Sequence, residues 1–322
     1  MRVLNAEDVT RLLTMDDCID AMDRAMRSLA RDDVAVPPRL IMPLIDDTGL
    51  LFVMPGSSRT IYGAKVIGLR PDNPRRGRPT IQGFVALFDP ETGTPLAIVD
   101  GGTITGMRTA AASGLATREL ARPDAKSHGV FGTGVQAASH IDAVAAVRDI
   151  DEVVVWGRSK EKAQALAQAE AERTGLSIRA AEDPKEAAAC DVVSTVTGAS
   201  GPILEGAWLT PGAHVNLVGA HSPTTREADS AAITRAGVFV ETLEAALREA
   251  GDILIPIEEG VFSKEAIRGT IGEVLLGLCP GRTEPNQITL YKSLGNTAQD
   301  LFAANAIFER ALAADAGVEI DW

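Results

Sequence analysis

Hydrophobic positions near the start of the chain change their spacing at Pro37 and Pro38. Before these prolines, apolar residues recur at helical spacing in two runs, 6–13 and 15–31. After them, short apolar runs alternate with turn-forming sequences, which is typical of an antiparallel sheet. The expected strands are 39–44, 50–54, 62–68, 82–88 and 95–99, and an alanine-rich helix is expected at 105–120.

From Ser127 onward, apolar runs of strand length alternate with runs of helical character. This alternation is typical of a doubly wound parallel sheet. The expected elements are 129–131, 135–147, 153–156, 160–174, 177–180, 184–189, 191–196, 214–218 and 238–241. A last long helix is expected at 292–314, beyond the final strand.

The two patterns predict an α/β protein of two domains, which a length of 322 residues also favours. We expect a Rossmann domain with a parallel sheet at 123–291. We expect an α+β domain with a mainly antiparallel sheet at 1–122, completed by a C-terminal helix within 292–322.

The charge balance argues against a partner with a phosphate backbone. The chain has 31 Lys and Arg against 44 Asp and Glu, a net charge of −13, so no nucleic-acid partner is expected. No signal peptide or spanning apolar run is apparent, and we therefore expect a cytoplasmic protein without a membrane partner. The three cysteines lack metal-site spacing and are expected to be buried apolar residues, with no metal.

A glycine-rich loop gives the first functional indication. Gly132 and Gly134, with Ala137, follow an expected strand and open an expected helix. In that context the spacing predicts a loop that holds a dinucleotide pyrophosphate against the helix N-terminus. The alternative is a glycine turn that binds nothing.

The end of the following strand bears on the type of dinucleotide. An acidic residue there accepts hydrogen bonds from the adenosine ribose in NAD-binding domains, but this chain has Gly157, Arg158, Ser159 and Lys160. Arg158 and Lys160 suit a 2′-phosphate, so NAD(P)H is expected with NADP slightly favoured. The alternative is that Arg158 and Ser159 only cap the next helix.

Three cations occupy expected regular elements rather than a solvated charge run. They are Arg39, Lys65 and Arg108, and Lys65 lies inside an apolar strand. A cation in such a place is costly unless an anion pairs with it. Internal salt bridges and a shared substrate carboxylate both remain open as explanations.

Taken together, several motifs in order along the chain carry a family resemblance. They are Lys65 with 71–74 and 78–83, then 89–97, 100–111, 132–137, 218–227 and 292–300. In these motifs the chain resembles the ornithine cyclodeaminase/mu-crystallin family over nearly its whole length. The resemblance implies a homodimer in which a substrate-binding and dimerisation domain faces a Rossmann domain.

The resemblance also implies site roles. Arg39, Lys65 and Arg108 are expected to bind the carboxylate of a small α-imino, α-keto or α-amino acid, with Thr80 between substrate and nicotinamide. The expected dinucleotide contacts are Val135 and Gln136 at the pyrophosphate, Gly157, Arg158 and Ser159 at the adenosine ribose, Val215, Asn216, Leu217 and Val218 at the nicotinamide half, and Leu294 near the ring.

One departure from the family pattern bears on the reaction. Cyclodeaminases of the family carry an aspartate where this chain has His221, and a histidine does not provide the same fixed anion. We therefore expect an NAD(P)H-dependent imine reductase or amino-acid dehydrogenase, acting on a cyclic ketimine such as pyrroline-2-carboxylate or on an alanine-type substrate. His221 is a candidate proton donor by residue type. The alternatives are a cyclodeaminase that recycles NAD internally and a non-catalytic dinucleotide-binding protein.

Overall fold

The computed structural model describes residues 1–321, and Trp322, the last residue of the expected range 292–322, lies outside the described residues. Contacts divide the chain into two compact units. The first unit runs from Met1 to Arg108 and resumes at Gly295, and the second unit is Thr109–Leu294. The division falls inside one helix, and the expected domain limits at 122 and 292 stay a prediction.

Two capped helices open the first unit. Asn5 caps α1 (Ala6–Leu12) and Thr14 caps α2 (Met15–Ala30), each in a reciprocal capping box with the aspartate three residues later. The expected apolar stripe of α2 is buried at Ile19, Met22 and Met26. Both helices match their predicted ranges to within one residue.

A mainly antiparallel sheet forms the body of the first unit, in the order β16-β1-β7-β6-β5-β4-β2, with β3 paired to β4. Only β1 and β7 pair in parallel. The strands are β1 (Arg2–Leu4), β2 (Val34–Ala35), β3 (Leu40–Pro43), β4 (Leu50–Ser58), β5 (Tyr62–Leu69), β6 (Ile81–Phe88), β7 (Pro95–Asp100) and β16 (Val318–Glu319). The expected mainly antiparallel sheet is confirmed, while the short strands β1, β2 and β16 were not predicted.

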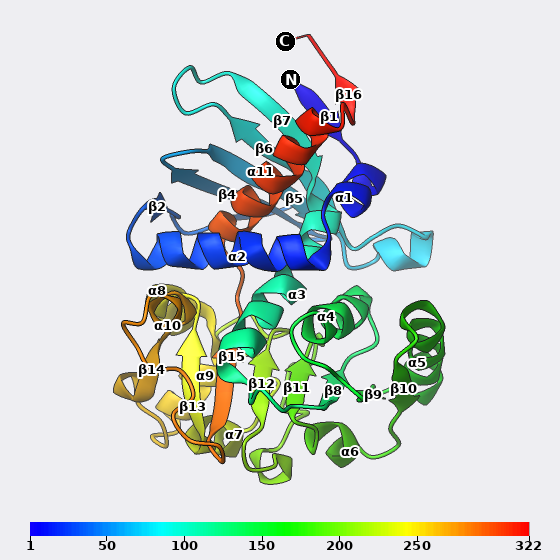
Figure 1. The fold of residues 1–322 in the computed structure, drawn as a ribbon, viewed down its shortest axis with the longest axis vertical. Helices are drawn as coiled ribbons and strands as arrows, with labels where there is room; N and C mark the ends of the chain where they lie inside the picture. The colour runs from blue at the N-terminus through cyan, green and yellow to red at the C-terminus, as the bar shows by residue number, and fades with distance from the viewer. Residues whose placement is uncertain (322) are drawn as a thin grey trace. The chain divides into compact units, whose positions relative to one another are not determined.

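Helix α11 (Thr297–Ala313) packs on this sheet against β4, β5 and β6, and α2 packs against α11 (Figure 1). Side chains alternate between the two faces of a strand, and in β5 the buried positions are Gly63, Lys65 and Ile67. A Cβ at Gly63 would lie 3.2 Å from Leu301 of α11. Lys65 is therefore on the face of the sheet that α11 covers.

A wholly parallel sheet forms the second unit, in the order β10-β9-β8-β11-β12-β15-β13-β14. The strands are β8 (Ser127–Phe131), β9 (Glu152–Trp156), β10 (Ser177–Ala180), β11 (Val192–Thr195), β12 (His214–Leu217), β13 (Ala236–Val240), β14 (Ile267–Thr270) and β15 (Ile288–Lys292). The first six strands in this order follow the Rossmann arrangement 3-2-1-4-5-6, so the expected doubly wound fold is confirmed.

Helices cover both faces of the parallel sheet. Successive residues of one strand enter different cores: Val130 packs with α4 and α5, whereas Phe131 packs with α6, α7 and α9. The helices not yet named are α3 (Gly101–Leu120), α4 (Val135–Ala145), α5 (Lys160–Thr174), α6 (Pro184–Ala188), α7 (Ser230–Arg235), α8 (Leu243–Glu249), α9 (Gly251–Glu258) and α10 (Ile271–Leu275). Along the whole described chain there are also the single turns η1 (Asn73–Arg76), η2 (Gly206–Trp208) and η3 (Lys264–Ala266). No helix among residues 1–321 is long and apolar enough to cross a membrane.

The expected helix at 292–314 was wrong at its start. Lys292 ends strand β15, which lies between β12 and β13, and the helix begins five residues later at Thr297. Gly295 has a positive φ of 77°, which breaks the chain direction, and Asn296 caps the helix by accepting from Gln299 N. Lys292 is fully buried there and pairs with Asp252 at 3.0 Å, which makes a lysine compatible with a central strand.

Candidate functional site

The glycine loop lies at the carboxyl end of β8, where α4 begins. Gly132 has φ 137°, and a Cβ there would lie 2.9 Å from the carbonyl oxygen of Val196. Gly134 is the N-cap of α4, and a Cβ there would meet nothing within 4 Å. One glycine is thus required by the turn, while the other leaves open space in front of free helix N–H groups.

A cavity of about 330 Å³ lies in front of this loop. Its lining residues come from the carboxyl ends of β8, β9 and β11: Gly132, Thr133, Gly134, Trp156, Gly157, Arg158, Ser159, Lys162, Val196, Thr197, Gly198, Ala199 and Ile203. Ligands of open α/β sheets bind at this edge. The residues present therefore fit a dinucleotide, with its pyrophosphate at the α4 N-terminus.

The cavity has an exposed cation at the end of β9. Arg158 is exposed and lines the cavity, whereas Lys160 forms an ion pair with Glu182 at 3.4 Å. Lys162 lines the cavity in its place. Ser159 accepts a hydrogen bond from Lys162 N as the cap of α5, so the capping alternative describes Ser159. Arg158 and Lys162 thus line the cavity. The expectation that Arg158 and Lys160 suit a 2′-phosphate stays a prediction.

Strand β12 carries three of the residues expected at the nicotinamide half. Val215 and Leu217 are fully buried in the core, and Asn216 donates to Thr117 Oγ1 at 3.1 Å. None of these three side chains is among those that line the cavity, and Val218, which follows the strand, is half-buried. Their contact with the nicotinamide half stays a prediction.

Three other predicted cofactor residues flank these segments. Leu294, close to the end of β15, packs in the core of the second unit. Val135, the first residue of α4, is 76% exposed, and Gln136 after it is half-buried. Val135 and Gln136 therefore start the helix whose N-terminus faces the cavity.

A buried charge cluster lies in the first unit, between β5, α3 and α11. Lys65 Nζ is 2.9 Å from Asp300 Oδ1, and Arg108 Nε is 3.0 Å from the same oxygen. Arg108 also donates to Gln299 Oε1 at 2.8 Å. All three charged groups are at most 6% exposed. We call Lys65, Arg108 and Asp300 the cationic cluster.

The cationic cluster carries an excess of positive charge. Burial lowers the pKa of Lys65 to about 8, although the Asp300 carboxylate opposes this shift. Burial raises the pKa of Asp300, but the charges of Arg108 and Lys65 hold it below its usual range. Two cations minus one carboxylate leave one positive charge, and Asp300 Oδ2 has no hydrogen-bond partner among residues 1–321. Such a cluster favours binding of a further anion.

The remaining predicted residues lie at different places. Arg39 is half-buried and donates to Gly295 O at 3.0 Å, and its charge contributes to lowering the pKa of Lys65, so it lies near the cationic cluster. Thr80 is half-buried just before β6. His221 is exposed in the second unit, where its Nδ1 is 3.0 Å from Gly219 O. The first unit thus brings Arg39, Lys65 and Arg108 together.

Sequence reasoning missed the anion that holds the cations. Asp300 appeared only as the end of a motif, because it is 235 residues away from Lys65 along the chain. Its position four residues after the capping Asn296 places it in the first turn of α11. The internal salt bridge and the carboxylate site, which were alternatives on sequence, are therefore compatible here.

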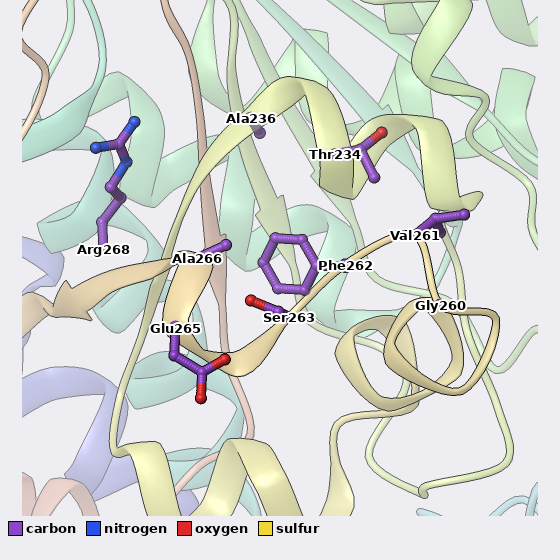
Figure 2. Close-up of a pocket in the computed structure, with 9 residues that line it drawn as sticks. All are labelled: Thr234, Ala236, Gly260, Val261, Phe262, Ser263, Glu265, Ala266 and Arg268. Atoms are coloured by element: carbon purple, nitrogen blue, oxygen red, sulfur yellow. The ribbon is translucent and has the colours of Figure 1, made fainter.

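A larger cavity of about 560 Å³ lies elsewhere in the second unit (Figure 2). It is lined by Thr234, Ala236, Gly260, Val261, Phe262, Ser263, Glu265, Ala266 and Arg268. Ala236 begins β13, so this cavity lies at the amino edge of the parallel sheet. Ligands of doubly wound sheets bind at the opposite edge, and the cavity is therefore not part of the dinucleotide site.

Known proteins resemble the chain along its whole length. The sequence is 36% identical over 326 residues to a Delta(1)-pyrroline-2-carboxylate reductase of Bacillus cereus, covering 100% of each chain. A Delta(1)-pyrroline-2-carboxylate reductase of Thermococcus litoralis, solved with NADH and L-proline, has a TM-score of 0.95 at 34% identity, covering 99% of this chain and 100% of that one. An archaeal alanine dehydrogenase dimer with bound NAD has a TM-score of 0.94 at 33% identity, covering 100% and 99%.

The profile of one protein family also matches almost the entire sequence. The match spans residues 1–315 and therefore includes both the cationic cluster and the glycine loop. The family resemblance drawn from the motifs is confirmed. The chain belongs to the ornithine cyclodeaminase/mu-crystallin family.

Proposed function

We propose that this chain is an NAD(P)H-dependent reductase of small α-imino acids, with a cyclic ketimine carboxylate of the pyrroline-2-carboxylate type as substrate. The observation that carries the proposal is the cationic cluster. Its unbalanced positive charge is buried on Lys65 and Arg108, where a substrate carboxylate would complete the pairing. The B. cereus and T. litoralis relatives, which are named as reductases of this imine, support the choice.

A bound reduced dinucleotide supplies a hydride for the imine carbon. The residues of the chain act by binding and orientation: Arg108 and Lys65, with Arg39 beside them, hold the carboxylate and so fix the adjacent C=N group. The imine nitrogen also needs a proton. Lys65 is a second candidate donor beside His221, because its lowered pKa of about 8 lies close to neutrality.

The type of dinucleotide is a finer part of the proposal. Relatives of known structure hold NADH and NAD, but in this chain two cations line the cavity, Arg158 after β9 and Lys162 in the first turn of α5. We propose that it uses both dinucleotides and favours NADPH. A cytoplasmic location belongs to the same proposal, because reduced nicotinamide dinucleotides are held inside cells.

A homodimer is the second finer part. The first unit exposes apolar side chains on and just after β3, which are Leu40 at 61% exposed, Ile41, Met42 and Ile45. An exposed apolar surface on a sheet favours a protein partner, and the alanine dehydrogenase relative is a dimer. The mass of the chain in solution tests this, and a monomer at micromolar concentration would contradict it.

The test of the main proposal is a substrate screen against NADH and NADPH. Cyclic imino acids, and pyruvate with ammonia or methylamine, are supplied to the purified chain while the nicotinamide absorbance is followed. We expect stoichiometric loss of reduced dinucleotide with a cyclic imino acid. Release of ammonia and proline from ornithine without net absorbance change would instead identify a cyclodeaminase. Dinucleotide binding without turnover of any of these compounds would contradict both enzymes.

A further inference from the structure

A second buried carboxylate, Glu227, lies in the second unit between β12 and α7. It is fully buried, and each of its oxygens accepts two hydrogen bonds. Oε1 accepts from N and Oγ1 of Thr197, both at 2.7 Å. Oε2 accepts from Thr195 Oγ1 at 2.8 Å and from Gly219 N at 2.6 Å. Glu227 therefore ties the segment after β11 to the segment after β12.

Two further charged groups hold Glu227 in place. Asp252 Oδ1 accepts from the backbone N–H groups of Glu227 and Ala228, at 2.8 and 3.1 Å. Lys292 Nζ is 3.0 Å from Asp252 Oδ2 and donates to Ala220 O at 2.6 Å. Both groups are fully buried. The three side chains make a rigid connection beneath the segments 195–199 and 217–220.

Space around Gly219 shows how closely the carboxylate supports the backbone. A Cβ at Gly219 would lie 2.0 Å from Thr197 O and 2.6 Å from Glu227 Oε1. No side chain larger than hydrogen fits between these atoms. The two segments and the Glu227 carboxylate are therefore packed as one body.

The supported segments lie on one side of the dinucleotide loop. In the sheet, β9 neighbours β8 on one side, and β11 and β12 follow on the other. A dinucleotide whose adenosine half lies at the end of β9 has its nicotinamide half over β11 and β12. Thr197, Gly198 and Ala199 line the cavity on that side.

We propose that Glu227 is a positioning residue, which fixes the segments 195–199 and 217–220 for the nicotinamide half of the dinucleotide. The proposal rests on the proposed function, because it assumes a nicotinamide dinucleotide in the cavity. Glu227 is buried beneath the backbone that it supports and acts through Thr197 and Gly219.

The test compares a whole dinucleotide with a fragment that lacks nicotinamide. NADH is compared with ADP-ribose, and NADPH is compared with ADP-ribose 2′-phosphate. In Glu227→Gln the shape is kept, but the amide NH₂ group cannot accept the hydrogen bonds that one oxygen now receives. We expect the variant to bind the reduced dinucleotide about tenfold more weakly than the unaltered chain, with fragment affinity unchanged.

Two further variants accompany Glu227→Gln, of which the first is a control and the second is an independent test. Glu170→Gln changes another buried carboxylate of the second unit, which pairs with Arg173 on α5, and should leave both affinities unchanged. Thr195→Val removes one donor to Glu227 from a buried position outside the cavity lining. We expect it to weaken dinucleotide binding about threefold and to leave the fragment affinity unchanged.

Unchanged dinucleotide affinity in Glu227→Gln would overturn the proposal, and so would an equal loss of affinity for dinucleotide and fragment. If Glu227→Gln does not fold, Thr195→Val decides by the same criteria. An unaltered chain that binds no dinucleotide would overturn the proposed function as well. Binding by the unaltered chain, with no effect of either variant, would overturn only the role of Glu227.

Discussion

The two units bury carboxylates in different ways. In the first unit, Asp300 meets Lys65 and Arg108 through one oxygen, and its other oxygen has no hydrogen-bond partner among residues 1–321. In the second unit, both oxygens of Glu227 accept two hydrogen bonds. A cluster with excess positive charge keeps capacity for an anionic ligand, whereas a carboxylate whose two oxygens are both satisfied stabilises the framework around a ligand.

The units also differ in the groups that titrate. All four histidines belong to the second unit, and His128, His140 and His214 are fully buried there. Their partners are hydroxyl, amide and backbone groups, such as Ser194 for His128 and Ser113 for His140. Burial keeps these three imidazoles neutral, so they oppose protonation as the pH falls.

The largest expected effect comes from removing a cation from the incompletely paired cluster. In Lys65→Met, Arg108 and Asp300 neutralise each other, and Arg39 beside them is left to hold the substrate carboxylate. We expect kcat/KM for the imino acid to fall about 10³-fold, which is the scale of losing a buried charge partner. Dinucleotide affinity, measured by fluorescence titration, should not change.

The exposed Lys264→Met serves as the control and should behave as the unaltered chain. Joint loss of dinucleotide binding and activity in Lys65→Met would mean that Lys65 supports the fold instead. The comparison between a ligand cluster and a framework cluster would then fail.

Acid should weaken the second unit through its buried histidines. Burial lowers the pKa of His128 and His214 to about 3 and that of His140 to about 4, against 6.5 when unfolded. The unfolded chain binds protons first, so stability falls as pH drops below 6.5. At pH 5.5 the three sites together should cost on the order of 4 kcal/mol of unfolding free energy.

Denaturant unfolding between pH 7.5 and 5.5 measures this loss. His140→Gln removes one titrating site, and its stability should depend less steeply on pH than that of the unaltered chain. An identical slope in the variant would show that folded His140 binds a proton as readily as unfolded His140 does, contrary to the burial seen here.

A carboxylate ligand should stabilise the chain through the cationic cluster. L-proline, which is bound in the T. litoralis relative, should raise the unfolding free energy by about 3 kcal/mol at 100 times its dissociation constant. The thermal midpoint should rise accordingly in the unaltered chain but not in Lys65→Met. Reduced dinucleotide should protect both proteins, and protection of the variant by proline would place the carboxylate elsewhere.

The smallest expected effect concerns the exposed cation Arg158, because solvent screens its charge more strongly than that of the buried Lys65. Arg158→Ala should raise the KM for NADPH about tenfold and leave the KM for NADH unchanged. Lys160→Ala is the matched control, because Lys160 pairs with Glu182 outside the cavity lining. Equal changes for both dinucleotides in Arg158→Ala would exclude a contact with the 2′-phosphate.

Local sequence patterns predicted most of the fold, because periodicity and glycine turns act over a few residues. The glycine loop and the alternation after Ser127 predicted the parallel sheet, and apolar residues at helical spacing predicted α1 and α2. Strand β15 was missed, because Lys292 is compatible with a central strand only when Asp252 neutralises it. That pairing joins residues 40 positions apart, which no local pattern reveals.

The candidate site was predictable only in part for the same reason. Arg39, Lys65 and Arg108 were identified from their burial cost and the family motifs, but Asp300 and Glu227 were not given roles. Lys160 was named beside Arg158 and Lys162 was not, because which residue of one helical turn meets the cavity depends on the tertiary fold. A cation's partner is determined by the tertiary fold, and spacing alone does not specify it.

The discontinuity of the first unit has a consequence for synthesis of the chain. Lys65 and Arg108 obtain their carboxylate from α11, and β1 pairs with β16 close to the other end of the chain. The second unit, Thr109–Leu294, is continuous and is translated in between. Because units fold as their residues become available, the second unit can fold on the ribosome first. The carboxylate site is then completed only after α11, which follows the second unit, has been synthesised.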